Sequence, residues 1–380
     1  MKTLDPEALA RALALRDLSD PALGPHAVQR ILDSALAALG PAWGCELRVV
    51  RARPVVSVAD NYDALHYPPG AAARDVRHTR YVSTERLLRT QTSAMIPPAL
   101  RALAASPPQG DVLLACPGLV YRRDAIDRVH VGEPHQVDLW RIGTRGPALG
   151  IPDLLSMIAR VAEAVAPGRP VSVSPAVHPY TLEGRQIDVR VGSAWMEIGE
   201  CGLAHPAILA EAGLPPGASG LAMGLGLDRL VMIAKGLDDI RLLRAPDPRI
   251  ASQMLDLAPW RPVSRHPPIR RDLSIAVAPG VDAESLGDRV REALGDRAGD
   301  VEAVEVVSDT PGEALPSAAR ERLGLRPGQR NVLLRVVLRA HERSLTDEEA
   351  NALRDAIYAA VHEGEAWSWA SEGRRAAGPA

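Results

Sequence analysis

The sequence of 380 residues lacks phenylalanine altogether and contains only two lysines, Lys2 and Lys235. Its three cysteines are distant from one another and show none of the paired spacings of a zinc site, so we expect reduced thiols and no structural zinc. There is also no run of eighteen apolar residues and no signal-peptide pattern. These absences argue against a membrane span and against export, and they favour a cytoplasmic protein.

An excess of charge of one sign is absent as well, because 44 basic and 47 acidic residues leave a formal net charge of −3. A chain this balanced is not a general nucleic-acid binder, so local arginine patches would have to bind a large polyanion. The hydrophobic content of 46% and the charged content of 24% are those of an ordinary globular protein. The length predicts two or three domains.

The first two thirds of the chain predict many strands with few helices between them. Residues 6–16 and 25–39 are rich in alanine and leucine and predict helices, the second ended by Gly40-Pro41. Residues 85–106 predict a helix that Pro97-Pro98 breaks. The remaining predictions are strands at 46–53, 111–116, 137–142, 186–191 and 193–198, and a helix at 151–165. This order indicates a largely antiparallel sheet.

A proline-rich polar stretch over residues 260–268 predicts a domain boundary. Beyond it the predicted order is strand, helix, strand, strand, helix and strand, which is the ferredoxin-like plan. These elements fall at 272–277, 283–294, 301–307, 332–339, 347–364 and 366–369, with a capping box at Thr346-Asp347-Glu348-Glu349. We therefore predict an α+β protein with N-terminal helices over 1–44, a central domain over 45–260 and a ferredoxin-like βαββαβ domain over 264–380.

Two glycines at alternate positions, Gly224 and Gly226, stand directly before an apolar helical pattern that ends near Gly236. Glycine lets the backbone turn tightly and lie close to a ligand that a side chain would push away. Arg229 lies at this predicted junction of strand and helix, and a guanidinium can cover a purine ring and neutralise phosphate. Such a motif alone more often reflects packing, so its meaning depends on partners elsewhere in the chain.

A second basic motif follows the strand predicted at 111–116, in the run Pro117-Gly118-Leu119-Val120-Tyr121-Arg122-Arg123-Asp124. His130 and the run Pro134-His135-Gln136-Val137-Asp138 lie just downstream. With these motifs followed by Arg229, the sequence resembles the class II aminoacyl-tRNA synthetases, and most closely the phenylalanyl-tRNA synthetases. The resemblance extends over roughly residues 25–370 and includes the tail, which is similar to the ferredoxin-fold anticodon-binding domain of that family.

The resemblance implies a class II antiparallel sheet with flanking helices, ATP-dependent activation of an amino acid, and transfer of that amino acid to tRNA. These steps depend on charge neutralisation and positioning more than on a protein nucleophile. The implied catalytic residues are Arg122 and Arg229, and both are also expected to bind ATP. The other implied ATP-binding residues are Asp124, His130, Pro134 and Glu197, the last also with Mg²⁺. The implied amino-acid-binding residues are Gln91, Ser93, Gln136, Asp138, His178, Tyr180 and Ala222.

The substrate pocket departs from the family pattern. His178-Pro179-Tyr180 stands where the family has Phe-Pro-Phe, whose rings pack edge-on against the substrate ring. Imidazole and phenol need hydrogen-bond partners when buried, and such a pocket can discriminate by on the order of 10⁴-fold against a ligand without the partner group. Pro134 replaces a phenylalanine under adenine, and Gln91 replaces a histidine. The scaffold predicts adenylation, and the amino acid stays open between phenylalanine and a more polar relative.

Two other functions stay open. One is a paralogue that adenylates a different carboxylic acid for an acceptor other than tRNA. The other is a non-catalytic RNA-binding regulator, which the retained Arg122 and Arg229 disfavour. The expected partners are tRNA and a small amino acid, with no membrane, and the protein is expected to be a monomer or a homodimer. The missing phenylalanine adds the hypothesis that an enzyme making phenylalanyl-tRNA needs no phenylalanine for its own synthesis.

Overall fold

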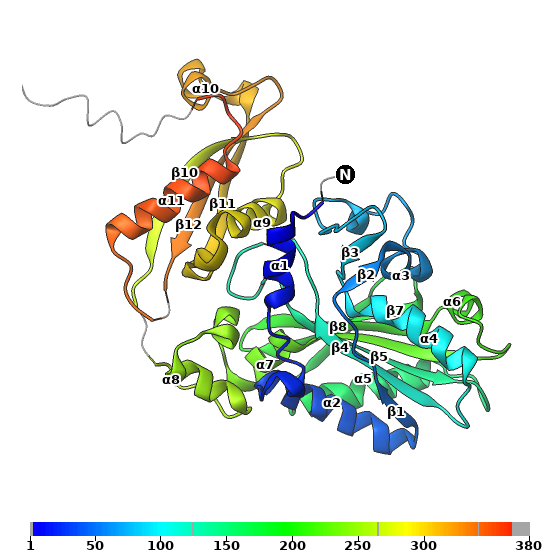
Figure 1. Ribbon diagram of the computed structural model, residues 1–380. Helices are drawn as coiled ribbons and strands as arrows, with labels where there is room; N and C mark the ends of the chain where they lie inside the picture. Colours follow the sequence, from blue (N-terminus) through cyan, green and yellow to red (C-terminus); the bar gives the residue numbers. More distant parts are fainter. Residues whose placement is uncertain (1–2, 124, 264–265, 341, 367–380) are drawn as a thin grey trace, which may run out of the picture. The chain divides into compact units, whose positions relative to one another are not determined.

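The computed structural model describes residues 3–123, 125–263, 266–340 and 342–366 (Figure 1). The chain divides into two compact units. The first takes the chain up to Arg122 and then Glu133–Arg261, and the second takes Arg123–Gly132 and the chain from Pro262 on. Within the described ranges no helix is both long and apolar enough to cross a membrane.

A sheet with the strand order β1-β4-β5-β9-β8-β7-β6 forms the centre of the first unit. β1 and β4 are parallel, and every other neighbouring pair is antiparallel. The bounds are β1 Glu46–Val49, β4 Val112–Leu119, β5 His135–Gly143, β6 Val171–Pro175, β7 Thr181–Val191, β8 Ala194–Ala204 and β9 Ser219–Gly226. β2 (Val55–Ser57) and β3 (Arg86–Leu88) form a separate antiparallel pair. The largely antiparallel sheet predicted from the sequence is confirmed.

Helices cover both faces of this sheet (Figure 1). α2 (Ala27–Trp43) contacts α5 (Ile151–Val165) and α7 (Leu227–Lys235). α4 (Ile96–Ala105) packs into a core that includes Leu114, Cys116 and Trp140. The sheet needs both covers because successive residues of a strand point to opposite faces and all of β4 is buried. The remaining helices of this unit are α1 Pro6–Ala14, α3 Val58–Asn61, α6 Pro206–Glu211 and α8 Pro248–Ala251.

Two of the local predictions are wrong, both at prolines. α2 does not stop at Gly40-Pro41 but continues to Trp43 and ends at Gly44 in the left-handed conformation. Pro41 falls near the end of the helix, where one missing backbone bond costs little. The helix predicted at 85–106 is instead β3, a 3₁₀ turn at Thr92–Met95 and then α4. Pro97-Pro98 lies in the first turn of α4, where N–H groups lack intrahelical partners, so these prolines open the helix.

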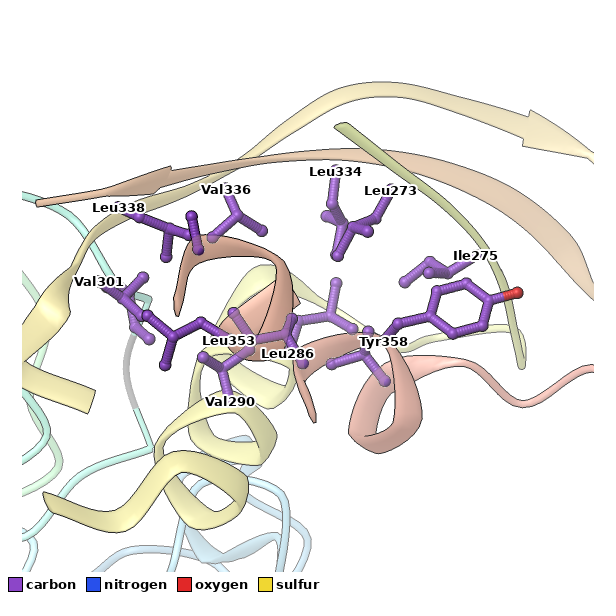
Figure 2. Close-up of a cluster of buried hydrophobic side chains, with 14 of the residues drawn as sticks. Leu273, Ile275, Leu286, Val290, Val301, Leu334, Val336, Leu338, Leu353 and Tyr358 are labelled. Atoms are coloured by element: carbon purple, nitrogen blue, oxygen red, sulfur yellow. The ribbon is translucent and has the colours of Figure 1, made fainter. Parts of the chain in front are cut away.

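The second unit contains an antiparallel sheet of order β10-β12-β11 with α9 and α11 packed against it (Figure 2). The bounds are β10 Ile269–Val277, α9 Ala283–Leu294, β11 Val301–Pro311, α10 Ser317–Leu323, β12 Arg330–Leu338 and α11 Asp347–Val361. The capping box predicted at Thr346 is present. The element order confirms the ferredoxin-like prediction as far as α11. Beyond Ala366 the predicted last strand lies outside the described residues.

The core of the second unit provides a test of its packing. Ile357 on α11 is fully buried, whereas Val306 on β11 is 46% exposed. We expect Ile357→Ala to lower the free energy of unfolding by about 2–5 kcal/mol, because it removes buried methyl groups and leaves a cavity. Val306→Ala should change it by less than about 0.5 kcal/mol. Urea titration of both variants measures the difference, and equal losses would contradict the packing.

Candidate functional site

β5 begins at the edge of the sheet where its two neighbours, β4 and β9, end. The last residues of β4 and β9 are opposite the first two residues of β5, His135 and Gln136. Arg122 follows β4 by three residues, and Arg229 lies in the first turn of α7, directly after β9. Adjacent strands are about 4.8 Å apart, so the ends of β4 and β9 are roughly 10 Å apart. The fold therefore brings the two predicted arginines to the same edge of one sheet.

The end of β9 leaves the surface of the sheet open. Asp138 on β5 and Glu200 on β8 are both directly opposite Gly224, so their side chains lie on the same face, on either side of this glycine. A Cβ on Gly224 would approach Asp138 Oδ2 no closer than 3.9 Å, and a Cβ on Gly226 would meet no atom within 4 Å. We call this open strip, Gly224 and Gly226, the glycine trough. It can admit a ligand close to the backbone.

Asp138 forms one side of the glycine trough and is held by three donors. Thr92 Oγ1 donates to Asp138 Oδ2 at 2.7 Å, and Ser93 Oγ donates to Oδ1 at 3.0 Å. Trp140 Nε1 donates to Oδ1 at 3.1 Å. Burial raises the pKa of Asp138, although these hydrogen bonds oppose the rise. The sequence placed Ser93 and Asp138 in the amino-acid site, and the structure brings them into direct contact.

A cluster of rings surrounds the other predicted pocket residues. Tyr180 stacks on Trp140 with ring centroids 6.3 Å apart and lies 5.4 Å from His178 and 6.2 Å from Tyr67. The Tyr67 hydroxyl donates to Gln91 Oε1 at 3.1 Å. Burial raises the pKa of Tyr67 to about 12, so its hydroxyl stays protonated and remains a donor at neutral pH. Gln91 therefore belongs to the same wall as His178 and Tyr180, from which it is distant in the sequence.

His178 and Glu200 form a hydrogen bond on this wall, with His178 Nε2 2.6 Å from Glu200 Oε2. The Glu200 side chain is 40% exposed and that of His178 is 13% exposed. Sequence reasoning missed Glu200, and the available signal was its place two residues from Gly202 on the strand before the glycine motif. Ala222, a predicted pocket residue, is buried on β9 directly opposite Trp140.

The predicted ATP-binding residues of the first unit lie near the ends of the central strands. Arg122 Nε donates to the Thr90 carbonyl at 3.1 Å, and the Pro134 carbonyl accepts from Val120 N at 2.9 Å. Arg229 Nη1 lies 3.6 Å from Glu197 Oε2, with the two side chains 25% and 43% exposed. A carboxylate and a guanidinium at this distance attract each other while both remain accessible to a charged ligand.

Two predicted ATP-binding residues are not among the described residues of the first unit. His130 lies in the segment Arg123–Gly132, which forms part of the second unit, and its Nδ1 is 2.7 Å from Asp127 Oδ2. In that unit Ile126 packs into the hydrophobic core and Arg128 pairs with Glu302. Asp124 lies outside the described residues.

A polar network that the sequence did not reveal begins at Asp228, the residue before Arg229. Asp228 is 4% exposed and accepts from His135 N and, at 2.8 Å, from His135 Nδ1. His135 Nε2 accepts from Leu18 N at 2.9 Å and lies 3.1 Å from Arg244 Nη2. An Nε2 that accepts places the ring proton on Nδ1, so His135 is neutral and links the charges of Asp228 and Arg244. The network fixes the start of α7, and hence Arg229, to the first residue of β5.

Comparison with known families agrees with this arrangement. Residues 27–254 match the class II core domain (F) of the tRNA synthetases, and residues 264–366 match the ferredoxin-fold anticodon-binding domain. The chain belongs to the class II tRNA synthetases. Its first unit contains the core of this class, and its C-terminal domain has the anticodon-binding fold.

Named relatives of this class II synthetase include two phenylalanine–tRNA ligases. The alpha subunit of Prochlorococcus marinus (strain NATL2A) is 37% identical over 194 residues, which are 51% of this chain and 56% of the relative. The chloroplastic/mitochondrial enzyme of Arabidopsis thaliana is 26% identical over 317 residues, 80% of this chain and 68% of the relative. The chain thus spans little more than half the length of the alpha subunits it matches.

Among solved structures, a pyrrolysyl tRNA synthetase of Desulfitobacterium hafniense aligns with 58% of this synthetase and 73% of its own chain. The identity is 16% and the TM-score is 0.43. A similarity this distant adds nothing about the substrate.

Replacing Asp228 by asparagine tests the buried network. Burial alone would raise the pKa of Asp228, but the hydrogen bonds from His135 together with the charge of Arg244 outweigh it and hold the pKa below its usual value. A depressed pKa means that the carboxylate stabilises the fold above its unfolded pKa and that this contribution disappears as pH falls through the folded pKa. We expect Asp228→Asn to lose about 1–3 kcal/mol of unfolding free energy at pH 7, because the buried donors of His135 lose their charged acceptor.

Urea unfolding measured from pH 7 downward checks this, and the gap between wild type and Asp228→Asn should shrink below about pH 4. Asp33→Asn on the exposed side of α2 is the matched control and should stay near wild type. A pH-independent gap would contradict the charge network.

Two glycines of neighbouring strands should respond differently to alanine. A Cβ on Gly199 would lie 2.1 Å from the Gly224 carbonyl oxygen, whereas a Cβ on Gly224 has open space. We expect Gly199→Ala to cost about 1–3 kcal/mol of unfolding free energy. Gly224→Ala should fold with nearly wild-type stability while narrowing the trough. Thermal and urea unfolding compare the two, and a large loss for Gly224→Ala would mean that the trough is closed.

Proposed function

We propose that this class II synthetase activates an amino acid with ATP and transfers it to tRNA, as a phenylalanine–tRNA ligase-like enzyme. The observation that carries the proposal is the shared sheet edge, where Arg122 and Arg229 follow the ends of β4 and β9 and β9 ends in the open glycine trough. Two fixed guanidiniums around an accessible strip of backbone suit a triphosphate, which needs positive charge on more than one side.

In the proposed reaction the substrate carboxylate attacks the α-phosphate of ATP and pyrophosphate leaves. A ribose hydroxyl at the tRNA 3′ end then takes the acyl group and AMP leaves. Arg122 and Arg229 would neutralise the charge that develops on the phosphates, and Arg229 would also cover the adenine ring. No protein nucleophile is required, because both steps depend on positioning.

The residues present fit an ATP-bound Mg²⁺ rather than a resident metal site. The described residues contain no group of three or more His, Cys, Asp or Glu side chains that could hold a metal ion. Glu197, 43% exposed beside Arg229, could supply one carboxylate ligand to a Mg²⁺ whose other ligands are phosphate oxygens and water. Pro134 would lie under the adenine ring.

The side of the trough that faces β5 would hold the amino acid. Gln136 is opposite Gly226, and Asp138, which accepts from Ser93, is opposite Gly224. An amide oxygen and a carboxylate there suit the substrate ammonium group. Gln91, His178, Tyr180 and Ala222 would surround the side chain of the substrate.

The matched anticodon-binding domain and the names of the relatives support tRNA as the acceptor. They disfavour a paralogue that serves a different acceptor, and the two retained arginines disfavour a regulator without activity. We further propose a cytoplasmic monomer or homodimer. The buried thiols of Cys116 and Cys201 fit a reducing compartment, because burial raises the pKa of each and leaves both unreactive.

Pyrophosphate exchange tests the activation step. We expect wild-type protein to exchange pyrophosphate into ATP in an amino-acid-dependent manner, and Arg229→Ala to lower the rate by about 10²- to 10³-fold, because one major transition-state contact is lost. Arg145→Ala, an exposed arginine in the turn after β5, is the matched control and should retain the rate.

If no amino acid in a broad panel supports exchange by folded protein, catalysis is refuted. Unchanged exchange by Arg229→Ala would refute the role of that residue alone. Charging of total tRNA then distinguishes the ligase from an enzyme with another acceptor.

A further inference from the structure

A carboxylate that sequence reasoning did not assign lies directly beside the glycine trough. Asp138 on β5 and Glu200 on β8 are both opposite Gly224 on β9. The trough therefore runs between two acidic side chains, one from each strand that pairs with β9. Strand spacing places their Cα atoms roughly 10 Å apart. A short ligand lying on Gly224 would therefore reach both of them.

The two carboxylates differ in exposure and in the number of hydrogen bonds that they already accept. Asp138 is 4% exposed, and its oxygens already accept from Thr92, Ser93 and Trp140. Glu200 is 40% exposed in its side chain, and His178 contacts only its Oε2. Glu200 Oε1 has no hydrogen-bond partner in the described part of the chain. Glu200 thus retains an accessible acceptor with a negative charge.

We infer that Glu200 determines specificity, by accepting a hydrogen bond from a hydroxyl or amine at the end of the substrate side chain. The inference rests on the proposed function and names the class of its amino acid. His178 is a positioning residue, because its Nε2 holds the other oxygen of Glu200 and so orients Oε1.

The wall around Glu200 suits such a substrate better than a plain hydrocarbon ring. His178 and Tyr180 lie beside each other, and Tyr67 with Gln91 continues the same polar wall. A phenyl group over Gly224 would remove water from Glu200 without replacing its hydrogen bond, and an unpaired buried carboxylate is costly. A site that binds a donor in this way can reject the analogue that lacks it by 10⁴- to 10⁵-fold.

The test uses pairs of amino acids that differ only in the donor. Pyrophosphate exchange by the full chain is measured with phenylalanine against tyrosine and 4-aminophenylalanine, with norvaline against ornithine, and with norleucine against lysine. We expect the best substrate to be a donor-bearing member, with kcat/KM at least about 100-fold above its partner. In Glu200→Ala that ratio should fall at least about tenfold, mainly through loss of the preferred substrate.

Two further variants make the result specific. Glu200→Gln keeps the shape and one acceptor, and it should weaken an amine substrate more than a hydroxyl substrate. Glu163→Gln on the exposed side of α5 is the control and should leave every ratio unchanged. If Glu200→Ala fails to fold, the wild-type ratios and those of Glu200→Gln still test whether Glu200 determines specificity.

The outcomes separate the two claims. Exchange that is fastest with phenylalanine or another donor-free member overturns the inference and leaves the proposed function intact. The inference is also overturned if Glu200→Ala and Glu200→Gln both retain the preference for a donor, because another group must then accept the hydrogen bond from the substrate. Absence of exchange with every amino acid, in folded protein, removes the proposed function and the inference with it.

Discussion

The site depends on one constraint: residues 224 and 226 are glycines, which have no side chain to cover the sheet. β9 runs between β5 and β8, and a larger residue at Gly224 would fill the space between Asp138 and Glu200. Gly199 contributes from the next strand, because a side chain there would collide with the Gly224 carbonyl oxygen. Glycine is thus required at position 224 for an open surface and at position 199 for the close approach of β8 and β9.

Buried hydrogen bonds position the backbone of Arg229 next to this open strip. Asp228 binds both the backbone and the ring of His135, and His135 in turn contacts Arg244. These contacts tie the first turn of α7 to the first residue of β5. Arg229 follows Asp228 directly, so its backbone is positioned by a buried network while its side chain stays accessible. A site that acts by electrostatic stabilisation needs such preorganisation, because charges that must reorient lose much of their effect.

The absence of phenylalanine has a visible structural consequence. Tyrosines occupy buried aromatic positions, and their hydroxyls find partners: Tyr62 donates to the Ala73 carbonyl, Tyr81 to the Arg74 carbonyl, and Tyr121 to the Ala12 carbonyl. Each ring therefore adds a hydrogen bond that a phenyl group would not need. In the pocket wall the same chemistry, with His178 and Tyr180, produces a polar surface in place of an apolar one.

The sequence alone determined most of the order of elements, and it predicted the two arginines that the fold brings to one edge of the sheet. Glycine spacing, helical periodicity and the capping box at Thr346 act locally, so they can be read without coordinates. The errors at Pro41 and at Pro97-Pro98 arose because a proline can end a helix or begin one, and tertiary packing decides which. Only the fold revealed the pairing of Asp138 and Glu200 across Gly224 and the contact of Asp228 with His135. Strand register and burial join residues from distant parts of the chain, and no local pattern records which residues will be opposite one another.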